Sequence, residues 1–195
     1  SMANLQPRDY FSWLRVDDGV YSTSREYAPQ AQLAAFRAFW DGGLEPRIAY
    51  VASNLAHSPH QRPPDDWLPR RYPDDVFIRD TFEAMLVAFD AFVGRALAEV
   101  DLENTYVFLL SDNGTQPNLS ITPCGRLNPG GCVKTTTFQG GINMPLFVAG
   151  PRIPAGTTSS AVGSSTDIMA TVAQILDVPS PGDDSVSYWP TLLDP

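Results

Sequence analysis

The 195-residue chain is poor in positive charge and has no long apolar run. It carries 13 Lys and Arg residues against 22 Asp and Glu residues, a formal net charge of −9. Proteins that bind nucleic-acid backbones need an excess of cations, so this composition excludes a nucleic-acid partner. An acidic surface also disfavours anionic membranes, and no apolar stretch approaches the roughly 20 residues of a spanning helix. We therefore expect no membrane partner either.

Cysteine and histidine are equally scarce. Cys124 and Cys132 enclose a loop rich in Pro and Gly, and the two histidines are His57 and His60. A zinc site needs four closely spaced nitrogen or sulfur ligands, so these residues argue against one. The two thiols form a small disulfide or stay reduced, and the sequence leaves both open. The first ten residues are polar and lack the apolar core of a signal peptide.

The apolar residues that are present predict an α/β fold. Recurrence every three or four residues predicts helices over residues 29–40, from Asp74 or Asp75 to about residue 99, and from Ser164 or Thr166 to residue 176. Continuous apolar runs predict strands over residues 47–53, 106–110 and 145–149. We expect one domain over residues 1–195, a sheet covered by helices on both faces, with irregular segments at 1–26 and 179–195.

The candidate site lies where the strand 106–110 ends, at Ser111-Asp112-Asn113-Gly114. Open α/β sheets carry their chemistry at strand ends. Lys134 and the pair Gly140-Gly141 follow, and glycines allow close approach of backbone. Asp112, Asn113 and Lys134 together suit a metal or an oxyanion, although Asn-Gly is also a plain turn signal.

Both histidines follow the strand 47–53, three residues apart. An imidazole in such a place acts as a proton carrier or a metal ligand, or is simply a surface residue. The sequence adds His57 and His60 to the candidate site.

In their order and in their residue types, these motifs resemble those of the sulfatase family of the alkaline phosphatase superfamily. The matching segments are Asn54–Pro59, Asp90–Gly94, Thr105–Gly114, Lys134 with Gln139–Pro145, and Asp167–Thr171. The resemblance implies that Asp112 and Asn113 form half of a site for calcium or another divalent metal. It further implies that Lys134 binds a sulfate or phosphate oxygen and that His57 acts at the leaving-group oxygen. His60 is assigned as a further metal ligand.

The chain also departs from the family pattern. The family's formylglycine arises in Cys/Ser-x-Pro-x-Arg, but Arg126 lies two residues after Cys124 and Lys134 two residues after Cys132. The family's opening strand with its acidic pair is missing as well. We therefore expect a partial sulfatase-like sheet, truncated at its N-terminal half. As it stands such a chain is cytoplasmic, or periplasmic if it derives from a longer sulfatase.

Two functions follow from this resemblance. In the first, the chain is a promiscuous, metal-assisted hydrolase in which water attacks activated phosphate, phosphotriester or sulfate esters without a formylglycine nucleophile. Its partners are then small anionic or neutral esters. In the second, the chain is a non-catalytic folded remnant or assembly module of a sulfatase. In either case the uncovered sheet edge predicts a homodimer or larger homo-oligomer.

Overall fold

The computed structural model describes residues 27–42, 46–69, 78–117, 119, 133–180 and 184–195. The chain divides into two compact units, residues 1–100 and 101–195, which are described one at a time. The segment 1–26, Cys124 and Cys132 lie outside the described residues, so the expectations for them stay predictions. The same holds for the single domain over residues 1–195.

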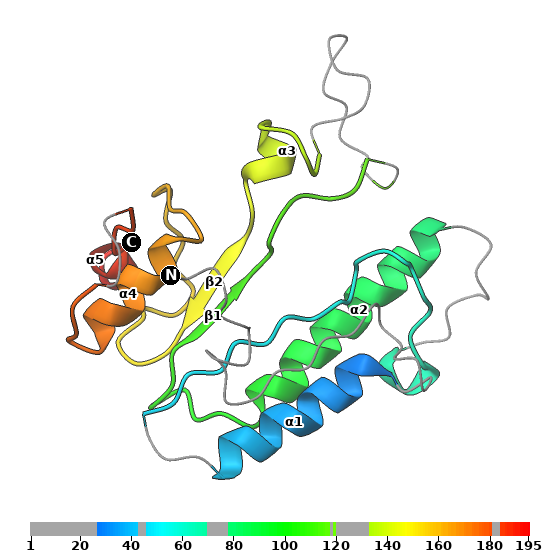
Figure 1. Ribbon diagram of the computed structural model, residues 1–195, viewed down its shortest axis with the longest axis horizontal. Coiled ribbons are helices and arrows are strands. Elements are labelled where there is room, and N and C mark those ends of the chain that lie inside the picture. The colour runs from blue at the N-terminus through cyan, green and yellow to red at the C-terminus, as the bar shows by residue number, and fades with distance from the viewer. Residues whose placement is uncertain (1–26, 43–45, 70–77, 118, 120–132, 181–183) are drawn as a thin grey trace, which may run out of the picture. The chain divides into compact units, whose positions relative to one another are not determined.

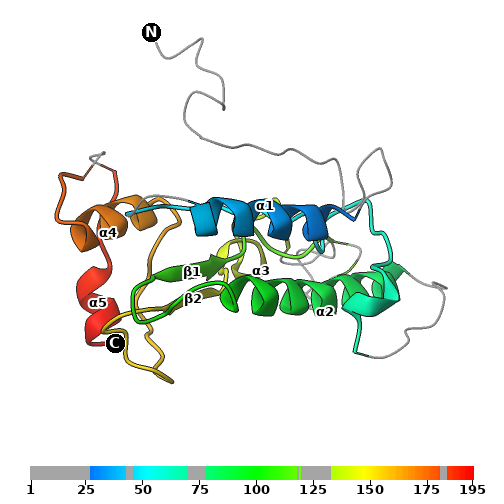
Figure 2. The ribbon, with the colours of Figure 1, turned by 90° about the horizontal axis from the view of Figure 1, so that it is seen from below.

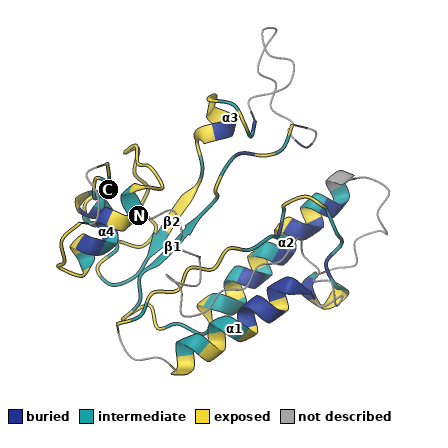
Figure 3. Cartoon of the chain, in the orientation of Figure 1, coloured by how far each residue is buried: buried dark blue, intermediate teal, exposed yellow. Residues whose placement is uncertain are grey.

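Two helices make up most of the first unit. Helices α1 (Ala28–Gly42) and α2 (Ile78–Leu97) lie side by side (Figures 1 and 2), and a short 3₁₀ helix, Asp65–Trp67, lies between them in sequence. Both predicted helices are confirmed. Their facing sides are buried (Figure 3) around a core of Tyr27, Leu33, Leu55, Trp67, Met85, Ala88 and Phe92. Among the described helices, none is long and apolar enough to cross a bilayer.

The prediction of a buried strand over residues 47–53 is wrong, both as to strand pairing and as to burial. The segment is extended but belongs to no sheet within the described ranges, and its side chains are exposed: Ile48 by 69% and Tyr50 by 79%. A strand is stabilised only when another strand pairs with it, and a local apolar run does not supply that partner.

The second unit is built on a two-stranded sheet. Strands β1 (Val107–Leu110) and β2 (Leu146–Ala149) pair antiparallel, from Val107 opposite Ala149 to Leu110 opposite Leu146. Both strands fall within the predicted ranges. In this unit Phe147 is 63% exposed and Leu146 is 41% exposed.

Three helices complete this unit: α3 (Gln139–Ile142), α4 (Asp167–Ile175) and α5 (Trp189–Leu193). Helix α4 was predicted, whereas α5 corrects the expectation of an irregular tail. The Asp167 carboxylate accepts hydrogen bonds from the backbone N–H groups of Ser164 (2.8 Å) and Val186 (2.9 Å). These bonds hold the pKa of Asp167 below its usual value. Asp167 therefore fastens the segment before α5 onto the start of α4.

Candidate functional site

The turn after β1 presents the predicted acid and amide. Ser111 Oγ donates to the carbonyl of Asn113 at 2.9 Å, which closes the turn. Asn113 Nδ2 donates to Asp112 Oδ1, also at 2.9 Å, and Asp112 is exposed. Asp112 Oδ2 and Asn113 Oδ1 make no hydrogen bond within the described part of the chain. Two oxygen ligands thus remain available side by side.

Lys134, the only lysine of the sequence, sits in a second tight turn. The Thr136 N–H donates to the Val133 carbonyl at 3.0 Å, and Thr135 between them has φ 74°. This is the pattern of a type II turn, whose third position favours glycine. Thr136 Oγ1 also donates to the Val133 carbonyl (2.7 Å), which secures the turn. A β-branched residue in the left-handed region is strained, so the conformation of Thr135 lowers the stability of the folded chain.

Backbone contacts join the two turns. Gly114 N–H donates to the Gly141 carbonyl at 3.3 Å, and Lys134 N–H donates to the Thr115 carbonyl at 3.0 Å. The approach requires glycine, because a Cβ on Gly114 would lie 1.8 Å from the Gly140 carbonyl oxygen. A Cβ on Gly141 would lie 2.2 Å from the Thr136 carbonyl oxygen. The structure thereby brings the segments of Asp112, Asn113 and Lys134 together in one unit.

His57 and His60 belong to the other compact unit. His57 is exposed, and its Nδ1–H donates to the Ser58 carbonyl at 2.6 Å. A carbonyl can only accept, so this bond fixes the proton on Nδ1 and leaves Nε2 as the acceptor in the neutral ring. Leu55, which is buried in the core, anchors the loop that carries it.

His60 is packed rather than exposed. Its ring meets the Phe82 ring edge-on at 5.8 Å between centroids, and its Nε2 has no hydrogen-bond partner among the described residues. Burial, and then the positive charge of His57, lower the pKa of His60 below 6.5. His60 is therefore neutral at pH 7, the form that binds metals.

A hard divalent cation fits the donor type of Asp112 and Asn113 but not their number. Calcium takes about six to eight oxygen ligands, and these two residues offer one carboxylate oxygen and one amide oxygen. Within the described residues, no group of three or more His, Cys, Asp or Glu could hold a metal. Among the described residues, Asp112 and Asn113 by themselves do not complete a site for such a cation.

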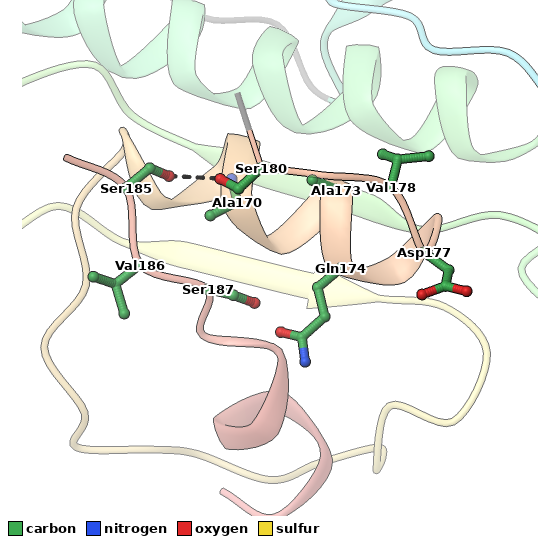
Figure 4. A pocket seen from close by; sticks show the side chains of 9 residues that line it. All are labelled: Ala170, Ala173, Gln174, Asp177, Val178, Ser180, Ser185, Val186 and Ser187. Carbon is green, nitrogen blue, oxygen red and sulfur yellow. Dashed lines mark hydrogen bonds between the residues drawn. The ribbon is translucent and has the colours of Figure 1, made fainter. Parts of the chain in front are cut away.

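A hollow of the second unit lies elsewhere. A pocket of about 440 Å³ opens between α4 and residues 177–180 and 185–187, with Gln174, Asp177 and Ser187 on its wall (Figure 4). None of the predicted site residues lines it. Its wall carries an acid and an amide but no cation, so we assign it no role in the site.

Sequence reasoning did not identify Thr135 and Thr136 as parts of the site. Their signal is the run Thr135-Thr136-Thr137 directly after Lys134, since Thr hydroxyls bond nearby backbone and close turns.

Comparisons with known proteins show the family of this chain. A model of the sulfatase family matches residues 9–178. N-acetylgalactosamine-6-sulfatase of Canis lupus familiaris is 37% identical over 95 residues, which cover 47% of this chain and 18% of that protein. Arylsulfatase G of Homo sapiens is 30% identical over 174 residues, 82% of this chain and 31% of that protein. The chain thus spans less than a third of these relatives.

Solved structures show the same fold. The crystal structure of Ps i-CgsB has a TM-score of 0.65 at 22% identity and covers 87% of this chain and 40% of that chain. Its complex with k-i-k-neocarrahexaose has a TM-score of 0.68 at 23% identity, with the same coverage. The predicted partial sulfatase-like α/β fold is confirmed. With a family model matched over most of its length, this chain belongs to the sulfatase family, whose members are sulfate ester hydrolases that generally use a divalent metal such as calcium.

Proposed function

We propose that this chain binds and hydrolyses sulfuric or phosphoric esters through Lys134, Asp112 and Asn113. The observation that carries the proposal is the pair of backbone hydrogen bonds, Gly114 to Gly141 and Lys134 to Thr115, that joins the two turns. They tie the backbone of Lys134 to the turn that carries Asp112 and Asn113, at the end of two paired strands. An anionic ester is stabilised by a positive charge and hydrogen-bond donors of this kind.

In the proposed reaction, water attacks the sulfur or phosphorus atom. A bond forms from the water oxygen to that atom, the bond to the ester oxygen breaks, and the alcohol leaves. Lys134 binds the non-bridging oxygens and stabilises the charge that grows on them. A divalent cation, when bound to Asp112 and Asn113, supplies further positive charge at these oxygens. The water's proton passes to solvent.

His57 keeps the role that the family resemblance gives it, as the donor of a proton to the leaving oxygen. Its Nδ1 is engaged with Ser58, so Nε2 is the atom that would carry that proton. His60 keeps its role as a further metal ligand, which its neutral ring suits. Both assignments are proposals.

The exposure of the site sets the class of substrate. Asp112 is exposed and Lys134 is half-buried, so water is not excluded and the groups are only loosely held. Loose positioning gives a weak catalyst that depends on a good leaving group. We therefore propose activated aryl sulfates, phosphates and phosphotriesters as substrates, with little discrimination between them.

The first test is binding. Lys134 is the only lysine, so reductive methylation with ¹³C-formaldehyde labels one side chain and the terminal amine. We expect titration with inorganic sulfate to shift the Lys134 methyl signal of the full chain. In the Asp112→Ala variant, measured in the presence of EDTA, this shift should be smaller. Asp184→Ala is the matched control, since Asp184 is exposed and makes no hydrogen bond in the described structure.

The second test is turnover of 4-nitrophenyl sulfate, 4-nitrophenyl phosphate and a 4-nitrophenyl phosphotriester, with EDTA and with added calcium. Losing a group that stabilises transition-state charge costs about 10² to 10³ in kcat. We expect Lys134→Met to lose that much on the anionic esters and less on the neutral triester, with Lys134→Arg between them. A non-catalytic module would show equal rates for the wild type, Lys134→Met, Asp112→Ala and His57→Ala.

A further inference from the structure

The Thr136 hydroxyl binds both backbone polar groups of a buried residue, Val133. Thr136 Oγ1 donates to the Val133 carbonyl at 2.7 Å and accepts the Val133 N–H at 3.2 Å. Val133 is 2% exposed. A hydroxyl has one donor and two acceptor positions, so Thr136 uses its only donor in this contact. One side chain thus fixes the start of the turn that carries Lys134.

The same hydroxyl lies against the segment that meets the turn after β1. A Cβ added to Gly141 would lie 2.9 Å from Thr136 Oγ1, so only a glycine leaves room for this oxygen. The Gly141 carbonyl in turn accepts the N–H of Gly114, the residue that follows Asn113. Thr136 therefore lies at the junction of the Lys134 turn with the turn after β1.

The neighbouring threonines make no such contact. Thr135 and Thr137 are exposed, and neither hydroxyl makes a hydrogen bond within the described residues. Thr135 is instead strained, at φ 74°. A strained residue keeps its conformation only where the bonds around it hold it there, and the bonds from Thr136 to Val133 close the turn on both sides of Thr135 and Lys134. Removing the hydroxyl should let this turn relax and move the backbone from which the Lys134 side chain extends.

We propose that Thr136 is a positioning residue of this site, which sets the place of the Lys134 backbone relative to the turn of Asp112 and Asn113. The inference rests on the proposed function, in which Lys134 stabilises the charge of the transition state. Thr136 does not touch the ester and acts through Lys134. A displaced cation still attracts an anionic ester in the ground state but stabilises the transition state less well, so kcat should fall while KM changes little.

The test is turnover of the three 4-nitrophenyl esters by the full chain and by Thr136→Val, which replaces the hydroxyl with a methyl group of similar size. A displacement of about 1 Å can cost about 10²-fold in rate, so we expect kcat on the sulfate to fall at least about tenfold, with KM changed less than about threefold. The loss should be smaller on the neutral phosphotriester, as for Lys134→Met. A partly unfolded variant would instead lose the same factor on every ester. Thr136→Ser keeps the hydroxyl and should restore most of the rate.

Thr137→Val is the matched control, because it makes the same change at the next residue, whose hydroxyl has no hydrogen bond within the described residues. It should keep kcat. Hydrogen exchange at the Lys134 N–H, which donates to the Thr115 carbonyl, needs no substrate and gives a second readout. We expect this exchange to be at least about tenfold faster in Thr136→Val and unchanged in Thr137→Val. If Thr136→Val does not fold, Thr136→Ala replaces it in both measurements.

The two proposals fail in different ways. A wild type that neither binds sulfate nor turns over any of the esters overturns the proposed function. An active wild type whose kcat survives in Thr136→Val overturns the positioning role alone, and so does an equal loss on the anionic and neutral esters. Lys134 N–H exchange at the wild-type rate in Thr136→Val overturns it as well, with or without turnover.

Discussion

Replacing Gly114 by alanine tests whether the two site turns approach as closely as the structure shows. The added Cβ would lie 1.8 Å from the Gly140 carbonyl oxygen, 2.8 Å from its carbonyl carbon and 3.0 Å from the Gly141 Cα. All three neighbours are backbone atoms, so no side-chain rotation can relieve the overlap. The two segments must move apart by more than about 1 Å, because non-bonded carbon and oxygen atoms do not approach closer than about 3 Å.

Such a movement breaks specific bonds. The Gly114 to Gly141 hydrogen bond is already 3.3 Å long and would break when the segments move apart. The Lys134 to Thr115 hydrogen bond would be stretched in the variant. Each lost hydrogen bond costs about 0.5–1.5 kcal/mol and overpacking about 1–3 kcal/mol. Reduced entropy of the unfolded chain returns about 0.4–1 kcal/mol. We therefore expect the free energy of unfolding to fall by about 2–4 kcal/mol, a large share of the usual 5–15 kcal/mol.

Urea unfolding of the wild type and the variant measures this difference. Gly163→Ala is the control in the same unit, because its Cβ would meet nothing closer than the Tyr188 ring at 3.4 Å. We expect it to be neutral or slightly stabilising. If Gly114→Ala unfolds within about 0.5 kcal/mol of Gly163→Ala, the normal scatter of surface substitutions, the close approach of the turns is not present in solution.

Three further predictions concern strain and pH. Thr135→Gly should raise the free energy of unfolding by about 0.5–1 kcal/mol, because it removes the backbone strain of a β-branched residue at φ 74°. If urea unfolding shows a lower free energy of unfolding for this variant, Thr135 is not strained. The pKa of His60 is lowered from 6.5, so its neutral form contributes stability that is complete above pH 6.5 and is lost as pH falls below it. His60→Gln should flatten that part of the thermal-unfolding profile. Burial, and then Asp167, raise the pKa of Tyr188 to about 12, so stability should be complete below pH 10 and fall as pH rises from 10 toward 12. Tyr188→Phe should remove that alkaline loss, and an unchanged profile would exclude Tyr188 as its source.

The helices were predictable because their signal is local. In α2 the buried Met85, Ala88 and Phe92 recur at three and four residues, and this spacing alone places them on one face. The segment 47–53 carries an equally clear apolar signal, but sheet pairing depends on residues far away in sequence. Helix α5 was missed although Pro190 lies in its first turn, a position that proline favours.

The candidate site was predictable in its residues but not in its geometry. Asp112 and Asn113 could be chosen because a strand ends there, and Lys134 because it is the nearby cation. The left-handed Thr135 could not be foreseen, because a β-branched residue argues against that conformation. It is imposed by the bonds that close the turn around it.

The strand pair and the joined turns bring together the two ends of one long connection through nested backbone pairings. Leu110 pairs with Leu146, Gly114 with Gly141, and Thr115 with Lys134, so each closure lies inside the previous one. The chain therefore leaves the joined turns at Thr115 and returns to them at Lys134. The entropic cost of closing a loop grows by only about 0.6 kcal/mol for each doubling of its length. The connection between Thr115 and Lys134 can therefore be shortened, lengthened or exchanged with little loss of stability in the paired strands and turns. Grafting foreign loops between Thr115 and Lys134 should thus be practical while leaving the two paired strands and the joined turns intact.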